Sequence, residues 1–243
     1  MNLHFVTSNP NKFRELSELL ECNLSCIELD LQEIQTTDLH ELVKFKLRQA
    51  YEHVQAPVIV EDTSLYFEAW NELPGPLVKF FLNNIGLSGM VRALDEFNNN
   101  SASAACCLGF TKDGKSMHLF EGKVKGVIVE PRGSQHFGWD AIFLPEGHQQ
   151  TFGEMSSHQK NQISPRGLAG PVCCLLLLCL LCGRDLDMSR GALMLESSQC
   201  GGCGTLGNGG ATLPRWMSSQ FGVRRAMQHW NPRGRNSVWM RSQ

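Results

Sequence analysis

Apolar and polar positions along the first part of the chain follow the periods of strands and helices in turn. Residues 3–6 form a short apolar run that stops at a polar turn, and apolar positions at helical spacing follow over residues 15–20. Residues 24–31 alternate as a strand does, residues 38–54 have a helical period, and residues 58–60 form a buried strand that ends at Glu61 and Asp62. This order predicts an α/β layer structure with parallel strand pairs, in which ligands bind at the carboxyl ends of strands.

The pattern changes after residue 100. Residues 102–111 and 117–130 are rich in strand-forming residues and flank a Lys-Asp-Gly-Lys turn, which predicts an antiparallel hairpin. Residues 142–144 form another short strand, and residues 153–168 permit a helix until Pro165. We therefore expect an elongated mixed central β-sheet flanked by helices, with a deep cleft between two lobes.

Composition divides the chain near Gly170. Residues 1–169 contain 14 Lys and Arg against 21 Asp and Glu, whereas residues 170–243 contain eight Arg, no Lys and three acidic residues. The second segment also holds six of the ten cysteines and 11 of the 23 glycines. We predict one α/β domain over residues 1–169 and a divergent tail over residues 170–243, which lacks periodicity and is expected to be disordered.

Charge and hydropathy narrow the classes of partner. A formal net charge of −2 gives no electrostatic case for binding nucleic acid or a membrane surface. The longest apolar run, residues 172–182, is shorter than the roughly 20 residues of a membrane span, and the N-terminus lacks the pattern of a signal peptide. We expect a cytoplasmic, reducing location in which the cysteines are thiols.

Two cysteine pairs in the tail have the spacing of a four-cysteine zinc site. Cys179 and Cys182 are separated by 17 residues from Cys200 and Cys203. The first pair lies in a leucine run and the second in glycine-rich sequence, without a small-domain core between them. This context argues against zinc.

Candidate chemistry begins with two polar blocks that follow predicted strands. Residues 7–12 (Thr-Ser-Asn-Pro-Asn-Lys) place hydroxyl, amide and ammonium groups at a helix N-terminus, which attracts phosphate. A helix cap beside a solvated lysine is the alternative, and the block is not a P-loop. Glu61 and Asp62 point to opposite faces of their strand, so one can enter the cleft. With Glu33 as a second carboxylate they suit a hard metal such as Mg²⁺, although each acid alone also suits a solvated loop.

Two later blocks carry rigid turns and aromatic rings. Residues 73–76 (Leu-Pro-Gly-Pro) form a rigid turn before Lys79, a pattern that a simple helix start explains equally well. Residues 137–140 (Phe-Gly-Trp-Asp) place two aromatic rings and an acid on a glycine-bent loop. They suit stacking and edge recognition of a heterocyclic base, with a hydrophobic anchor as the alternative. Lys160 and Arg166 add positive charge for a base carbonyl or a phosphate.

Taken in order, these motifs resemble the inosine triphosphate pyrophosphatases of the HAM1 family over residues 1–169. The resemblance rests on residues 6–9, 60–65, 73–76 and 137–140, and it continues from Glu154 to Arg166. It implies a deep nucleotide cleft, a homodimer and an Mg²⁺ cofactor, with Mn²⁺ as an alternative. It also implies hydrolysis of the non-canonical purine nucleotides ITP, dITP and XTP to the monophosphate and pyrophosphate.

The resemblance further implies roles for individual residues. Asp62 activates the attacking water, and Glu33 and Asp62 bind the metal. Lysines and hydrogen-bond donors near the start of the chain hold the triphosphate, while Phe137 stacks on the base. The implied substrate-binding set is Thr7, Ser8, Asn9, Lys12, Lys46, Asp62, Thr63, Lys79, Phe137, Gly138, Trp139, Asp140, Lys160 and Arg166.

The chain departs from the family pattern in two places. Pro165 stands where the family has a base-recognising histidine, so we expect weaker activity or selectivity and a displaced Arg166. The tail replaces the family's closing helix. One alternative is therefore a catalytically weak or inactive splice-type isoform that binds nucleotide or pairs with a normal subunit. The other is the related Maf-type pyrophosphatase, against which residues 137–140 argue.

Overall fold

The computed structural model of the protein describes residues 2–20, 23–135, 137–181, 186–187, 194–195 and 237–242. Its centre is an eight-stranded mixed sheet in which the strand order is β10-β6-β5-β3-β1-β2, with β4 paired to β3 and β7 paired to β6. β1 is parallel to β2 and to β3, and the other pairs are antiparallel. The strands are β1 (Leu3–Val6), β2 (Leu24–Ile27), β3 (Val58–Phe67), β4 (Leu73–Gly75), β5 (Ser101–Thr111), β6 (Met117–Ile128), β7 (Phe143–Pro145) and β10 (Ser237–Ser242).

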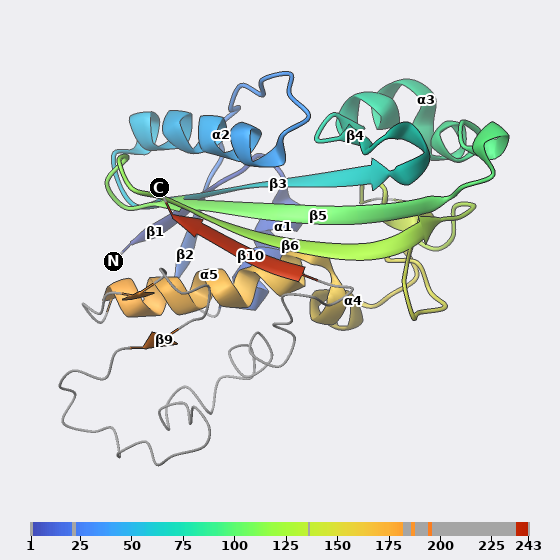
Figure 1. Ribbon diagram of the computed structural model, residues 1–243. Helices are drawn as coiled ribbons and strands as arrows, with labels where there is room; N and C mark the ends of the chain where they lie inside the picture. The colour runs from blue at the N-terminus through green and yellow to red at the C-terminus, as the bar shows by residue number, and fades with distance from the viewer. Residues whose placement is uncertain are drawn as a thin grey trace, which may run out of the picture.

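Helices cover both faces of this sheet (Figure 1). α2 packs on one face, against β3 and β5, while α5 packs on β5 and β6 from the other face with α1 beside it. The expected α/β fold with a mixed sheet flanked by helices is confirmed. The helices are α1 (Pro10–Leu20), α2 (Leu39–Val54), α3 (Val78–Arg92), α4 (Ser157–Ile163) and α5 (Pro165–Leu181), and a small second sheet pairs β8 (Leu186–Asp187) with β9 (Met194–Leu195).

β3 is longer than the sequence predicts. It pairs with β5 without a break from Val58 opposite Thr111 to Phe67 opposite Ala102. Glu61 and Asp62 therefore lie in the middle of a strand, and the expectation that the strand ends at them is wrong. The physical reason is that residues 63–67 are strand-forming and bury Leu65 and Phe67 in a hydrophobic cluster with Phe143 and Phe152.

Alternation along β3 separates two cores. Val58 and Val60 pack with α2, whereas Ile59 packs with α1 and α5. α2 begins where the sequence predicts, because the side chain of Asp38 accepts the backbone N–H groups of His40 and Glu41. The antiparallel hairpin of β5 and β6 is also confirmed. β2 is shorter than expected and ends at Ile27.

α5 corrects the prediction that the chain is disordered from residue 170. The helix continues to Leu181, and Ala169, Cys173 and Leu177 are buried against Phe110 and Phe120. These three positions are four residues apart and so share one helical face. The surrounding run is apolar on all sides, which hid this period in the sequence. No helix among the described residues is long and apolar enough to cross a membrane.

Part of the predicted tail also joins the main sheet. β10 pairs antiparallel with β6, from Ser237 opposite Lys123 to Ser242 opposite His118. The proposed zinc ligands Cys182, Cys200 and Cys203 lie outside the described residues, and only the helical backbone of Cys179 is described. The zinc hypothesis is therefore untested.

Candidate active site

Two adjoining pockets lie at the end of the sheet where β1 meets α1. One is lined by the loop after β2, α2 and α3, and the other by the residue 137–140 loop, α4 and α5. The first and the second pocket have five lining residues in common and so lie side by side. The shared residues are Asn9, Lys12, Thr63, Gly138 and Trp139.

The turn between β1 and α1 is held by its own polar groups. The Oδ1 atom of Asn9 accepts the backbone N–H groups of Asn11 at 2.9 Å and Lys12 at 3.3 Å, and the hydroxyl of Thr7 accepts the N–H of Asn9 at 3.1 Å. Asn9 thus caps α1, with Pro10 at the first helical position. The capping alternative is confirmed for Asn9, and a part in phosphate binding is a separate prediction.

On the α2 side of β3, acidic side chains converge on one lysine. The Nζ atom of Lys46 lies 2.7 Å from Oδ2 of Asp62 and 3.2 Å from Oε1 of Glu33. These two carboxylates outweigh the effect of burial and raise the pKa of Lys46. Lys79 approaches the other oxygen of Glu33 at 3.7 Å from an exposed position on α3. Oδ1 of Asp62 accepts the N–H of Thr63 at 2.7 Å.

Glu61 points to the opposite face, as the alternation predicts, and contacts side chains from α1 and α5. Its carboxylate accepts two hydrogen bonds from Arg166, at 2.7 and 2.9 Å, and lies 3.3 Å from Nζ of Lys12. Burial alone would raise the pKa of Glu61, but Arg166 and Lys12 outweigh it and lower that pKa to about 2. Burial would likewise lower the pKa of Arg166, which Glu61 instead holds well above its usual range.

Glu15 is a buried member of this network that the sequence analysis did not select. One oxygen of its carboxylate accepts a hydrogen bond from Lys160 at 3.0 Å, and the other contacts Arg166. Lys160 also contacts Asp140, whose pKa is raised to about 6 because burial outweighs the attraction of Lys160. The available signal was an acidic residue on the inward face of α1, next to the buried Leu16.

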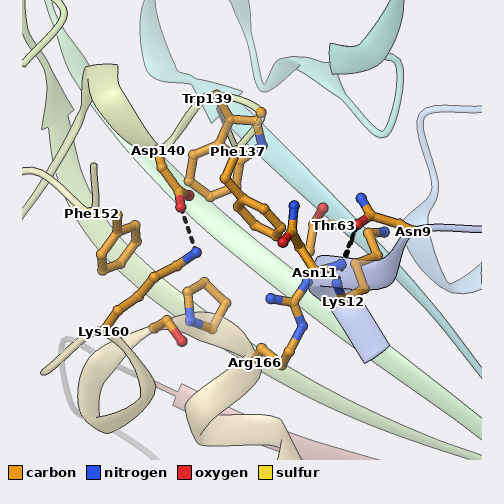
Figure 2. A pocket seen from close by; sticks show the side chains of 13 residues that line it. Asn9, Asn11, Lys12, Thr63, Phe137, Trp139, Asp140, Phe152, Lys160 and Arg166 are labelled. Carbon is orange, nitrogen blue, oxygen red and sulfur yellow. Dashed lines mark hydrogen bonds and ion pairs between the residues drawn. The ribbon is translucent and has the colours of Figure 1, made fainter. Parts of the chain in front are cut away.

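Figure 2 shows how the aromatic residues of the second pocket lie. The ring of Phe137 faces two cations, with Nζ of Lys160 4.0 Å and the guanidinium carbon of Arg166 5.7 Å from its centre. The Trp139 ring is buried and packs edge-on against Phe143. The Phe137 ring lines the pocket, and its stacking on a base stays a prediction. The buried Trp139 ring fits in part the alternative interpretation of residues 137–140 as a hydrophobic anchor.

The donor set fits a divalent metal that is completed by another ligand. Mg²⁺ prefers oxygen ligands and commonly takes one or two carboxylates together with phosphate oxygens. Glu33 and Asp62 already converge on the ammonium of Lys46, which stands in for such a cation. Among the described residues no group of three or more His, Cys, Asp or Glu side chains could hold a metal unaided. A metal here would need further oxygens, from the backbone, from water or from a bound ligand.

Comparison with known proteins decides the family. The Ham1 family model matches residues 3–171. This chain belongs to the Ham1 family. It is 44% identical over 168 residues to the inosine triphosphate pyrophosphatase of Schizosaccharomyces pombe, which covers 68% of this chain and 89% of that protein. It is 42% identical to inosine triphosphate pyrophosphatase 2 of Trypanosoma cruzi, which covers 68% of this chain and 86% of that protein.

A solved Ham1 structure gives the same picture. The HAM1 protein from Coxiella burnetii superimposes with a TM-score of 0.65 at 27% identity, covering 73% of this chain and 99% of that chain. The sequence segments from which the family resemblance was inferred fall within the matched range. The identification of the family from sequence is therefore confirmed.

In this Ham1 chain, every residue predicted to bind substrate or metal lines one of the two pockets. Their individual roles stay predictions. The departure at Pro165 also lies there, since Pro165 lines the second pocket as the first residue of α5. Ser164 has the extended backbone that a following proline favours. Arg166 nevertheless lines the pocket and pairs with Glu61, so the expected displacement is not observed.

Proposed function

We propose that this chain is a nucleoside triphosphate pyrophosphatase that hydrolyses ITP, dITP and XTP to the monophosphate and pyrophosphate. The observation that carries the proposal is the pair of adjoining pockets with shared lining residues. Lysines and paired carboxylates line one pocket, while an aromatic ring over two cations lines the other. The relatives from S. pombe and T. cruzi are named inosine triphosphate pyrophosphatases, which supports the same reaction. Such a reaction would serve to cleanse the nucleotide pool.

The first pocket supplies charge for the triphosphate. Lys12, Lys46 and Lys79 place three ammonium groups along it, and phosphoryl transfer depends on such positioning and charge neutralisation. We assign activation of the attacking water to Asp62, whose carboxylate lies between Lys46 and the N–H of Thr63. Glu33 and Asp62 would hold Mg²⁺, or Mn²⁺ in its place. When bound, the metal would neutralise charge on the phosphate oxygens.

The second pocket supplies base selection. Phe137 would stack on the purine, and Lys160 and Arg166 would donate to the 6-keto oxygen. Lys160 has three N–H donors, of which Glu15 and Asp140 engage two, so one is available to a base. The 6-amino group of ATP is itself a hydrogen-bond donor and would face the donors of Lys160 and Arg166. Buried polar groups would then be left unpaired, which carries a large penalty in binding free energy.

Two further expectations belong to this proposal. A homodimer would bury the apolar side chains that β4 and α3 expose, namely Leu73, Phe80 and Ile85. A cytoplasmic location agrees with Cys26, Cys106 and Cys107, which form no disulfide.

Hydrolysis of ITP in water labelled with heavy oxygen tests the reaction. Attack at the α-phosphate breaks its bond to the bridging oxygen, so the label should enter IMP and leave the released pyrophosphate unlabelled. Mass spectrometry of both products checks this outcome. Label in pyrophosphate, or release of IDP and inorganic phosphate, would contradict the proposal.

A further inference from the structure

The ammonium group of Lys46 lies where three oxygen atoms converge. Besides Asp62 at 2.7 Å and Glu33 at 3.2 Å, it donates to the backbone carbonyl of Glu61 at 3.4 Å. Three acceptors thus use all three donors of the ammonium. The side chain is only 10% exposed.

The same oxygens are those that a hard divalent cation would use. Two carboxylates and a carbonyl are typical ligands of Mg²⁺ and Mn²⁺. An ammonium group and a divalent cation repel each other, and at these distances they cannot share the same carboxylate oxygens. The other oxygen of Asp62 already accepts the N–H of Thr63, and the other oxygen of Glu33 faces Lys79. A metal that binds this carboxylate pair therefore competes with the Lys46 ammonium.

A bound triphosphate offers Lys46 another partner. Lys46 lines the pocket that also contains Lys12 and Lys79, which we assign to the phosphates. An ammonium that moves from the carboxylates to a phosphate oxygen exchanges one ion pair for another. The metal then takes the carboxylates that Lys46 released, so the number of paired charges in the buried site is preserved.

We propose that Lys46 is a competing cation that blocks divalent metal binding until nucleotide arrives, so that metal and nucleotide bind together. This inference rests on the metal site of the proposed function. Lys46 acts here as a positioning residue, because it determines when Glu33 and Asp62 become available.

Lys79 provides a matched control within the same pocket. It carries the same charge and approaches the same Glu33 carboxylate, but at 3.7 Å and with a side chain that is 71% exposed. Exposed ion pairs contribute little because water screens them. Removing the charge of Lys79 should therefore leave the metal affinity of nucleotide-free protein nearly unchanged.

Titration of nucleotide-free protein with Mn²⁺, followed by electron paramagnetic resonance, tests the inference without reference to catalysis. Lys46→Met should bind Mn²⁺ about tenfold more tightly than the wild type, because the competing charge is gone, and Lys79→Met should stay within about twofold. Equal Mn²⁺ affinity in Lys46→Met and the wild type, or no Mn²⁺ binding by either, would overturn the inference.

A second measurement covers the case in which Lys46→Met folds poorly. Lys46→Gln keeps a hydrogen-bond donor without the charge, and Mn²⁺ should raise its melting temperature more than that of the wild type. An equal or smaller rise would count against the inference. Hydrolysis of ITP by the wild type is assayed separately, so a protein without that activity whose Lys46 variants bind Mn²⁺ more tightly would contradict the proposed reaction alone.

Discussion

Two neighbouring acids on β3 have different surroundings because successive side chains of a strand point to opposite faces of the sheet. Asp62 faces α2 and lies in the pocket with Lys46, whereas Glu61 faces α1 and α5 and is fully enclosed by Arg166 and Lys12. The two neighbouring acids thus have different partners on the two faces of the sheet. Asp62 is available to ligands, and Glu61 fixes the cations on which the second pocket depends.

Glu61→Gln should destabilise the protein by about 3 kcal/mol at neutral pH, because it leaves the buried Arg166 without its anionic partner. The pKa of Glu61 lies near 2, below its ordinary value of 4.5, so its stabilising effect is present above about pH 4.5 and is lost as the pH falls towards 2. Urea unfolding of both proteins over this range measures the difference, which should shrink on acidification. An exposed control, Glu52→Gln on α2, should show no such trend, and a pH-independent difference for Glu61→Gln would contradict the account.

We expect Pro165 to affect substrate selectivity more than folding. It begins α5 at a position where the missing backbone N–H has no helical partner to lose, and Arg166 remains beside the pocket. Proline adds no hydrogen bond to a base, however. Pro165→His should raise kcat/KM for ITP relative to ATP by about tenfold, since a hydrogen bond to the base would be gained. Pro165→Ala, which removes the ring without adding an imidazole, is the control, and equal ratios in the wild type and the histidine variant would refute this expectation.

At the scale of elements, the sequence predicts helices and strands that are marked by local signals. It misses contacts and strand pairs that join residues far apart along the chain. α2 and the β5–β6 hairpin are marked by a cap and a turn within a few residues. By contrast, nothing near Glu15 indicates that its partner is Lys160. The pairing of β10 with β6 likewise joins segments that share no local signal.

α5 is the element on which the sequence and the structure differ most. Its Gly170 and Pro171 predict a break, yet Cys173 and Leu177 pack into the core under β5 and β6. Burial of this face outweighs the unfavourable propensity of the two residues. The inactive-isoform alternative assumed that no closing helix forms, and the structure removes that premise as far as Leu181.

Leu177→Ala tests whether α5 closes the fold. Leu177 is 4% exposed, so the substitution should lower the free energy of unfolding by about 2 to 4 kcal/mol. Phe97→Ala provides an exposed control, because Phe97 is 52% exposed, is not among the side chains assigned to the dimer, and its loss should cost less than about 1 kcal/mol. Denaturant unfolding measures both variants. Equal stability of Leu177→Ala and the wild type would mean that the residues after 170 do not contribute to the core.

At the scale of the whole molecule, the long strands connect the two pockets into one site. β3 carries Asp62 and Thr63 into the first pocket, and on its other face Glu61 holds Arg166 at the second pocket. Every residue that the motifs predicted for the site lines one of these pockets, whereas other lining residues, such as Phe152 and Leu29, were not predicted. The motifs could not predict the ion pairs among the lining residues, because those depend on how α1, α4 and α5 pack together.

Pyrophosphate release from ITP, XTP, ATP and GTP with Mg²⁺ tests the central claim most directly. We expect rapid release from ITP and XTP and slow release from ATP, whose 6-amino group meets the donors of the second pocket. GTP shares the 6-keto oxygen, so its slow release would depend on exclusion of its 2-amino group. Asp62→Asn should reduce kcat by a factor of about 100 or more, because the group assigned to activate water is lost. Folded wild-type protein that releases no pyrophosphate from ITP or XTP, or an Asp62→Asn variant as active as the wild type, would contradict the account.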